Sequence, residues 1–360
     1  MNAAYPFEIN VLENGKNLSG SVGWRCPSNI AIVKYWGKYG IQLPKNASIS
    51  FTLSNAHTDT YIDYSPSTTG GLSISFLFEN NENKAFANKI EKYLKSILEF
   101  YPILDHLHLD IRSTNSFPHS SGIASSASAM AAISMCVCEI DANISQAPYT
   151  DDFIDKASYL SRLGSGSASR SVVPYVAVWG EHTKIPPSTN LFAVAVEDVD
   201  EVFYTYHDDI LIVSAAEKSV SSTAGHKLMD NNVYAEARYR QANNRITELQ
   251  EILKAGDVHR FGRLAEDEAM TLHALMMCSD PSYILMEAGT LEMISAIRRY
   301  RKSTGAPIYF TLDAGPNIHL LYPESARSEA EKLITDHLLA FTANGRVIRD
   351  KVGDGPKKLV

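Results

Sequence analysis

The chain has few cysteines and no run of basic residues. Four cysteines in 360 residues (Cys26, Cys136, Cys138 and Cys278) are too few for a disulfide framework, so we expect buried free thiols in a reducing cytoplasm. No basic run with interleaved aromatic residues is present and the net charge is −8, which argues against a nucleic-acid partner. A small anionic substrate remains compatible with this charge, because a few local Lys and Arg side chains can hold it.

Export and membrane signals are also missing. The first residues, MNAAYPFEIN, have neither the basic flank nor the apolar stretch of a signal peptide. No hydrophobic run approaches the length that spans a bilayer, so we expect a cytoplasmic protein with no membrane partner. The Walker pattern GxxxxGK[ST] is absent as well, which argues against a P-loop NTPase.

A chain of 360 residues is too long for one ordinary hydrophobic core, so we predict two domains, residues 1–205 and 206–360. Strand-like segments are mixed with helical ones, which indicates an α+β fold with helices layered on antiparallel or mixed sheets. Apolar spacing predicts helices at about 85–99, 232–255, 257–274, 282–303 and 324–341, and one from Thr150, as N-cap, to Gly164. Strands are predicted in WRCPSNIAIVKYW, TDTYIDYS, LSISFLF, HLHLDIRST, VVPYVAVWGEH, NLFAVAVED, DDILIVSAAE, APIYFTLD, NIHLLYP and RVIRD.

Residues 118–134, PHSSGIASSASAMAAIS, combine a proline, a glycine and many serines with the start of an alanine-rich helix. Small residues let backbone N–H groups approach a ligand, and a helix start carries partial positive charge, so the segment suits a phosphate group. A tight strand-to-helix turn with a small-residue packing face is an equally good interpretation of this segment alone.

Two further segments carry cationic groups. Lys34 and Lys38 flank Tyr35 and are four residues apart, so they share a side only if the stretch is helical; the alternative is a surface lysine pair. In RLGSGSASRS (162–171) two glycines free the backbone around Ser165 and Ser167, and Arg170 offers a fork for a carboxylate or phosphate. We favour an anion site there over a helix cap followed by a serine-rich turn.

Two segments remain ambiguous on their own residues. In TLDAGPN (311–317) a strand ends at Asp313 before Gly315-Pro316, which suits either a displayed catalytic carboxylate or an aspartate that stabilises a turn. The segment EKSVSSTAGH (217–226), with Lys218, either closes over an anion or is an ordinary loop.

The residues of these segments and their order along the chain decide between most of these alternatives. The serine/glycine loop resembles the phosphate-binding motif of the GHMP kinase superfamily, Pro-x-x-x-Gly-Leu-x-Ser-Ser-Ala, through Pro118, Gly122, Ile123, Ser125, Ser126 and Ala127. Within that superfamily the chain resembles the diphosphomevalonate decarboxylase family, because NIAIVKYWGK, NASISFTLS, GIASSASA, RLGSGSASRS and DAGPN occur in that family's order between about residues 25 and 320.

The resemblance implies an N-terminal domain like domain 2 of ribosomal protein S5, a C-terminal ferredoxin-like domain, and an active site in the cleft between them. It also implies the reaction of (R)-5-diphosphomevalonate with ATP, through transient 3-phosphorylation, to isopentenyl diphosphate, CO2, ADP and phosphate. The alternatives are a GHMP-type small-molecule kinase, a decarboxylase acting on the 5-phosphate, and a catalytically silent binding protein on the same scaffold. A homodimer is a further expectation from the resemblance.

The family's functional positions carry over to numbered residues of this chain. Asp313 matches the catalytic aspartate, Lys34 the active-site lysine and Arg170 the arginine that holds the substrate carboxylate. The positions that hold the substrate's diphosphate are matched by Tyr35, Lys38, Ser165, Gly166 and Ser167. The ATP phosphate site is matched by Pro118, Ser120, Ser121, Gly122, Ala124, Ser125, Ser126 and Ser128, with Ser125 and Ser126 nearest the expected Mg2+.

Overall fold

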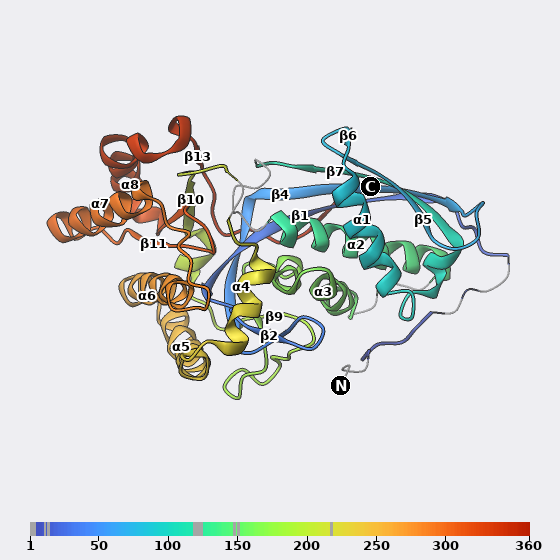
Figure 1. Cartoon of the computed structure of the whole chain (residues 1–360), viewed down its shortest axis with the longest axis horizontal. Coiled ribbons are helices and arrows are strands. Elements are labelled where there is room, and N and C mark those ends of the chain that lie inside the picture. Colours follow the sequence, from blue (N-terminus) through green and yellow to red (C-terminus); the bar gives the residue numbers. More distant parts are fainter. Residues whose placement is uncertain are drawn as a thin grey trace.

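Two long antiparallel strands, β1 (Gly20–Val33) and β4 (Ser48–Pro66), form the centre of the larger sheet. The computed structural model describes residues 5–10, 12, 15–117, 125–146, 149, 152–216 and 219–360. In Figure 1 these two strands run from the N-terminal helices on the right toward the C-terminal helices on the left. Their register shifts twice, between Pro27 and Asn29 and between Ala31 and Val33. Such irregularities re-aim side chains, and they occur here just before Lys34.

The larger sheet has eight strands, in the order β14-β1-β4-β7-β5-β6, with β8 added on β4 and β9 on β8. All of its pairings are antiparallel except that of β5 with β7. The other members are β5 (Ser73–Phe78), β6 (Asn81–Glu82), β7 (Leu107–Asn115), β8 (Val176–Trp179), β9 (Val194–Ala195) and β14 (Lys357–Lys358). A separate hairpin pairs β2 (Lys38–Tyr39) with β3 (Leu43–Pro44).

Three helices share a hydrophobic core with this sheet: α1 (Lys84–Ser96), α2 (Ser125–Ser145) and α3 (Phe153–Gly164). Helix α2 is the innermost, because most of its residues are buried. It is long and apolar enough to cross a membrane, which corrects the expectation from sequence that no run approaches that length. Since 78% of its apolar window is buried inside the protein, α2 has the character of a core helix.

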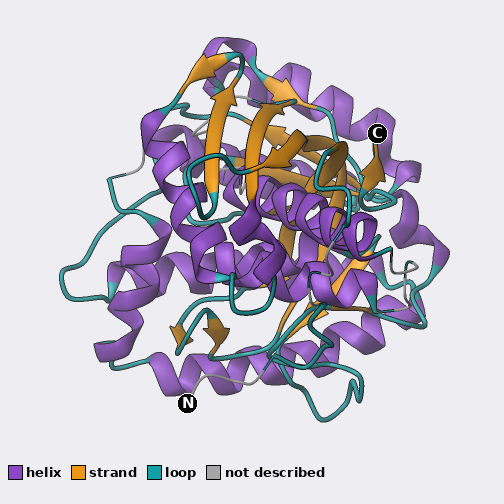
Figure 2. Ribbon diagram, turned by 90° about the vertical axis from the view of Figure 1, so that its right-hand side faces the viewer, coloured by secondary structure: helices purple, strands orange, loops and turns teal. Residues whose placement is uncertain are grey.

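The second half carries a four-stranded sheet in the order β11-β12-β10-β13. Its strands are β10 (His207–Leu211), β11 (Tyr309–Thr311), β12 (Ile318–Tyr322) and β13 (Val347–Ile348). The helices of this half are α4 (Ser222–Leu228), α5 (Ala235–Ala255), α6 (Val258–Met277), α7 (Ala288–Thr304) and α8 (Arg327–Leu333). Figure 2 shows helices packed on more than one side of the strands, as in an α+β fold.

The two halves are joined by a common core. Phe51 of β4 stacks on Phe261 of α6 with ring centroids 5.2 Å apart, and both belong to a cluster that includes Ile30 and Ile210. The chain also returns to its first sheet, because Lys358 of β14 pairs with Trp24 of β1. The boundary near residue 205 stays a prediction.

Most predicted helices and strands are confirmed, with differences at their ends. The N-cap of α3 is Asp152, and Thr150 lies outside the described residues. Residues 222–226, expected as a loop, begin helix α4, because the hydroxyl of Ser221 caps it by accepting from the N–H of Ala224 at 3.2 Å. All four cysteines are free, but Cys278 is exposed where buried thiols were expected.

Candidate active site

A cavity of about 300 Å³ lies where the two halves meet. It gathers nine of the residues singled out from the sequence: Lys34, Tyr35, Lys38, Ser126, Ser165, Gly166, Ser167, Arg170 and Asp313. The remaining lining residues are Asn29, Ala31, Trp36, Gln42, Lys89, Gly164, Ser222, Thr223, His226, Leu272 and Ala314. Among the described lining residues, four cations face a single carboxylate, so the cavity suits an anionic ligand.

Lys34 and Asp313 form an ion pair in this cavity. Lys34 Nζ lies 3.0 Å from Asp313 Oδ1, and the lysine is only 1% exposed. Asp313 follows β11, and its carbonyl accepts the N–H of Gly315 at 2.8 Å and contacts His273 Nε2 at 3.0 Å. The backbone therefore makes the turn, while the carboxylate reaches the cavity.

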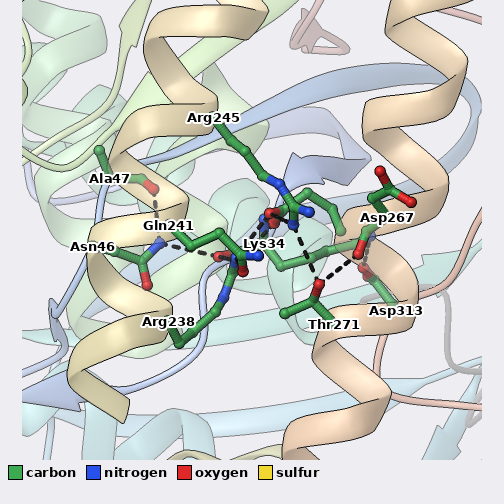
Figure 3. A network of polar contacts seen from close by, with 10 residues as sticks. Lys34, Asn46, Ala47, Arg238, Gln241, Arg245, Asp267, Thr271 and Asp313 are labelled. Atoms are coloured by element: carbon green, nitrogen blue, oxygen red, sulfur yellow. Dashed lines mark hydrogen bonds and ion pairs between the residues drawn. The ribbon is translucent and has the colours of Figure 1, made fainter. Parts of the chain in front are cut away.

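The backbone of Lys34 is held on both sides by residues of α5 and α6. Its N–H donates to Glu268 Oε2 at 2.8 Å, and its carbonyl accepts from Arg238 Nη2 at 3.2 Å and from Asn46 Nδ2 at 3.0 Å. Glu268 is fully buried and also accepts from Arg238 at 2.6 and 2.8 Å and from Arg245 at 2.6 Å. Figure 3 shows Arg238 and Arg245 reaching from one helix toward Lys34.

The charge of Glu268 is stabilised by these contacts. Burial alone would raise the pKa of the Glu268 carboxyl, but the two arginines and the Lys34 N–H bring it below its ordinary value. A charged carboxylate thus holds the peptide that carries the cavity's lysine.

Arg170 also lines the cavity and is 2% exposed. Its Nε donates to Ser50 Oγ at 3.0 Å and its Nη1 to Ser48 Oγ at 2.6 Å. Among the described residues, Nη2 has no hydrogen-bond partner. Burial lowers the pKa of Arg170 to about 10, against the opposing effect of Asp313. Its Nε also donates to Asn29 Oδ1 at 3.3 Å, so the guanidinium is fixed by neutral oxygen atoms and keeps one nitrogen for a ligand.

Gly166 and Tyr35 shape one wall of the cavity. A Cβ on Gly166 would come within 2.9 Å of both Trp179 and the Tyr35 hydroxyl, so only glycine fits without displacing a neighbour. The buried Tyr35 hydroxyl has no hydrogen-bond partner among the described residues. Lys38 is half-buried, and burial lowers its pKa. A phosphate oxygen bound in this cavity would give the orphaned hydroxyl a hydrogen-bond partner.

The serines of the predicted ATP site are placed differently from one another. Ser126 lines the cavity, and its Oγ lies 3.5 Å from Ser165 Oγ, so the two anion-site segments meet. Ser125 lines an adjacent apolar pocket with Phe76, Phe78 and Phe86. The structure does not bring Ser128 to the cavity: its hydroxyl is buried, 2.7 Å from Thr58 Oγ1. Pro118, Ser120, Ser121, Gly122 and Ala124 lie outside the described residues.

Sequence reasoning missed Glu268 and Arg238, and it named the segment 217–226 without singling out His226 at its end. Glu268 occupies the apolar face of α6, in register with the buried Phe261, Leu264 and Leu272. A carboxylate on a buried helical face needs a cationic partner, and this is the signal that could have found it.

The two-sheet α+β fold and the cation-rich cavity, with a glycine/serine segment at its wall, define an enzyme of the GHMP kinase type. A family model of diphosphomevalonate decarboxylase-like N-terminal domains matches residues 26–190, and a model of mevalonate 5-diphosphate decarboxylase C-terminal domains matches residues 209–358.

Individual relatives agree with the family models. The diphosphomevalonate decarboxylase of Schizosaccharomyces pombe is 30% identical over 92% of this chain and 85% of its own length. The diphosphomevalonate decarboxylase of Saccharomyces cerevisiae is 29% identical over 82% of this chain and 76% of its own length. The structure of mevalonate diphosphate decarboxylase from Staphylococcus aureus is similar with a TM-score of 0.81, at 25% identity, over 95% of this chain and 99% of that chain. The chain belongs to the diphosphomevalonate decarboxylase family.

Proposed function

We propose that this chain catalyses the ATP-dependent decarboxylation of (R)-5-diphosphomevalonate to isopentenyl diphosphate, CO2, ADP and phosphate. The observation that carries the proposal is the Lys34–Asp313 ion pair of 3.0 Å in one cavity with Arg170. A related structure at 23% identity and a TM-score of 0.80, MDDEF, holds MVAPP, AMPPCP and magnesium. Membership of the family supports the same substrate class here.

In the first step Asp313 would orient the tertiary hydroxyl of the substrate toward the γ-phosphate of ATP. The hydroxyl oxygen forms a bond to phosphorus, the bond to ADP breaks, and the hydroxyl proton passes to the Asp313 carboxylate. Lys34 Nζ, 3.0 Å from Asp313 Oδ1, holds that carboxylate in place through their ion pair.

In the second step the 3-phosphate leaves with the electron pair of its C–O bond, since phosphate is a far better leaving group than hydroxide. The bond to the carboxylate then breaks, its electrons form the C=C bond, and CO2 departs. Arg170 would hold the carboxylate through Nη2 so that the breaking bond is aligned with the carbon that becomes positive. Loss of such a charged contact costs roughly 2–4 kcal/mol of transition-state stabilisation.

The described residues that line the cavity are compatible with the binding of ATP and Mg2+. Ser126 and Ser125 open helix α2, and Ser126 faces the cavity that also holds Asp313. Hydroxyl oxygens together with phosphate oxygens suit Mg2+, which prefers few protein ligands at a nucleotide. When bound, the metal would offset charge on the transferred phosphoryl group. The pocket of Phe76, Phe78 and Phe86 beside Ser125 would receive the apolar face of the base.

A substrate panel tests the proposal. Mevalonate, its 5-phosphate and its 5-diphosphate are each supplied with ATP and Mg2+, and ADP and CO2 are measured together. We expect equal amounts of ADP and CO2 with the 5-diphosphate. ADP without CO2 would indicate a kinase, turnover of the 5-phosphate alone would indicate a phosphomevalonate decarboxylase, and no ADP with any compound would indicate a silent binding protein.

We also propose a cytoplasmic homodimer. Four free cysteines are compatible with a reducing compartment, and the dimer is an expectation from the family likeness. Light scattering of the purified chain would test the oligomeric state.

A further inference from the structure

His226 of helix α4 lines the cavity and ends the segment 217–226, for which the sequence left two interpretations open, closure over an anion or an ordinary loop. It is 8% exposed and comes from the second half of the chain, whereas Tyr35 and Lys38 come from the first. The position of α4 brings the ring against the segment that follows β1. His226 therefore faces the same ligand space as Lys38.

The ring is held in one orientation. Its Nδ1 accepts the backbone N–H of Gly37 at 2.9 Å. Its faces pack on Tyr35 and Trp36, with ring centroids 4.3 and 4.5 Å away. Gly37 has φ +102°, and a Cβ there would come within 2.3 Å of the Tyr239 hydroxyl, so the residue that supplies this N–H cannot easily be replaced.

The position of the proton follows from these contacts. Burial and the nearby Lys38 charge lower the pKa of His226 to about 3, so the ring is neutral at physiological pH. A neutral imidazole has one N–H, and because Nδ1 accepts from Gly37, that N–H is on Nε2. Among the described residues, Nε2 has no hydrogen-bond partner. His226 thus presents one fixed N–H donor beside Lys38 and the orphaned Tyr35 hydroxyl.

We propose that His226 is a substrate-binding residue that donates Nε2–H to a phosphate oxygen of the substrate's 5-diphosphate. This inference rests on the proposed function. Three donors of different kinds, an ammonium, a phenol and an imidazole N–H, then line the same cavity as the Lys34–Asp313 pair, which acts on the tertiary carbon. Because His226 is neutral, it contributes a directed hydrogen bond, whereas Lys38 contributes the positive charge.

Two amide variants separate a binding role from a packing role. His226→Asn keeps an acceptor near the position of Nδ1 for Gly37, but its amide does not reach the position of Nε2. His226→Gln reaches the position of Nε2 with a donor but gives up the Gly37 contact. We expect His226→Asn to raise the KM for 5-diphosphomevalonate about 10- to 100-fold, the range for losing a hydrogen bond to a charged group. His226→Gln should recover most of this loss.

The measurements are steady-state kinetics for both substrates, calorimetric binding of 5-diphosphomevalonate, and the thermal midpoint of each variant. In both variants kcat and the KM for ATP should change less than about threefold, since the proposed contact is to the 5-diphosphate and not to the tertiary carbon or the nucleotide. An unchanged KM in His226→Asn overturns the assignment. Equal losses in both variants with a lowered thermal midpoint also overturn it, because the ring would then act through packing.

Failure of the inference and failure of the proposed function give different results. If the wild-type protein binds and turns over 5-diphosphomevalonate while His226→Asn is unaffected, only the role of His226 is wrong. If the wild-type protein does not bind 5-diphosphomevalonate by calorimetry, both are wrong.

Discussion

Replacing Glu268 with glutamine should impair catalysis, although Glu268 does not line the cavity. The substitution keeps the size of the side chain and removes its charge. In the wild-type protein the carboxylate accepts from Lys34 N–H and from both Arg238 and Arg245, and none of its surface is exposed. The amide has one acceptor oxygen, so at least one of these donors loses its partner.

The magnitude follows from the burial of Arg238. Its side chain is 1% exposed, so Glu268→Gln leaves a buried guanidinium without its counter-charge. Removing one partner of a buried ion pair costs about 3–5 kcal/mol of stability. Because the same carboxylate positions the Lys34 peptide, we also expect kcat to fall about 10- to 100-fold, the usual effect of misplacing a reacting group by about 1 Å.

A neighbouring glutamate provides the matched control. Glu266 is also buried on α6 and contacts Arg301 at 2.7 Å and Arg298 at 3.3 Å, but it makes no contact with Lys34 among the described residues. Urea denaturation and steady-state kinetics would be compared for Glu268→Gln and Glu266→Gln, at a temperature where both are folded. Both should lose stability, and only Glu268→Gln should lose kcat.

Acid provides a second measurement on the same variant. The pKa of Glu268 is lowered in the folded state, so its contribution to stability is present above the unfolded pKa and is lost as pH falls through the folded pKa. The unfolding free energy of the wild-type protein should therefore fall more steeply below about pH 4 than that of Glu268→Gln. A Glu268→Gln variant with the kcat of Glu266→Gln would refute the positioning argument.

Three further substitutions test the cavity itself. Asp313→Asn should abolish CO2 release, with kcat reduced at least about 1,000-fold and substrate binding by calorimetry changed far less, because the amide cannot take the hydroxyl proton; CO2 release at the wild-type rate would exclude a catalytic role for Asp313. Arg170→Gln, which keeps a polar side chain and removes the positive charge, should lower kcat/KM for 5-diphosphomevalonate by about 100-fold, the cost of a lost charge-assisted contact; an unchanged kcat/KM would contradict its role in holding the carboxylate. Gly166→Ala should raise the KM for 5-diphosphomevalonate about tenfold or more, since its Cβ would lie within 2.9 Å of Trp179 and Tyr35, and an unchanged KM would show that this wall does not touch substrate.

Much of the cavity could be predicted because its residues lie in short segments that are unusual in composition. Lys34, Arg170 and Asp313 each follow or interrupt a regular element, where a polar side chain among small or apolar residues has few structural explanations. The alternative for Asp313, a turn aspartate, was resolved only by geometry. The carbonyl makes the turn contacts and the carboxylate meets Lys34.

The residues behind the cavity could not be found in this way. Arg238 and Glu268 lie in long helices whose polar positions usually face water, and they approach each other only when α5 packs on α6. His226 was hidden for a different reason. A serine-rich segment predicts a loop, but the Ser221 cap starts a helix there that turns the histidine toward Gly37.

Lys34 explains why the cavity needs both halves of the chain. It follows a strand of the first half, yet its side chain meets Asp313, its N–H meets Glu268 and its carbonyl meets Arg238, all from the second half. Separation of the halves would break these three contacts together and expose the core that they share. The ion pair that carries the proposed chemistry therefore exists only in the docked arrangement. A substrate bound between Arg170 on one side and Asp313 on the other would stabilise that arrangement further, by the free energy of its own binding.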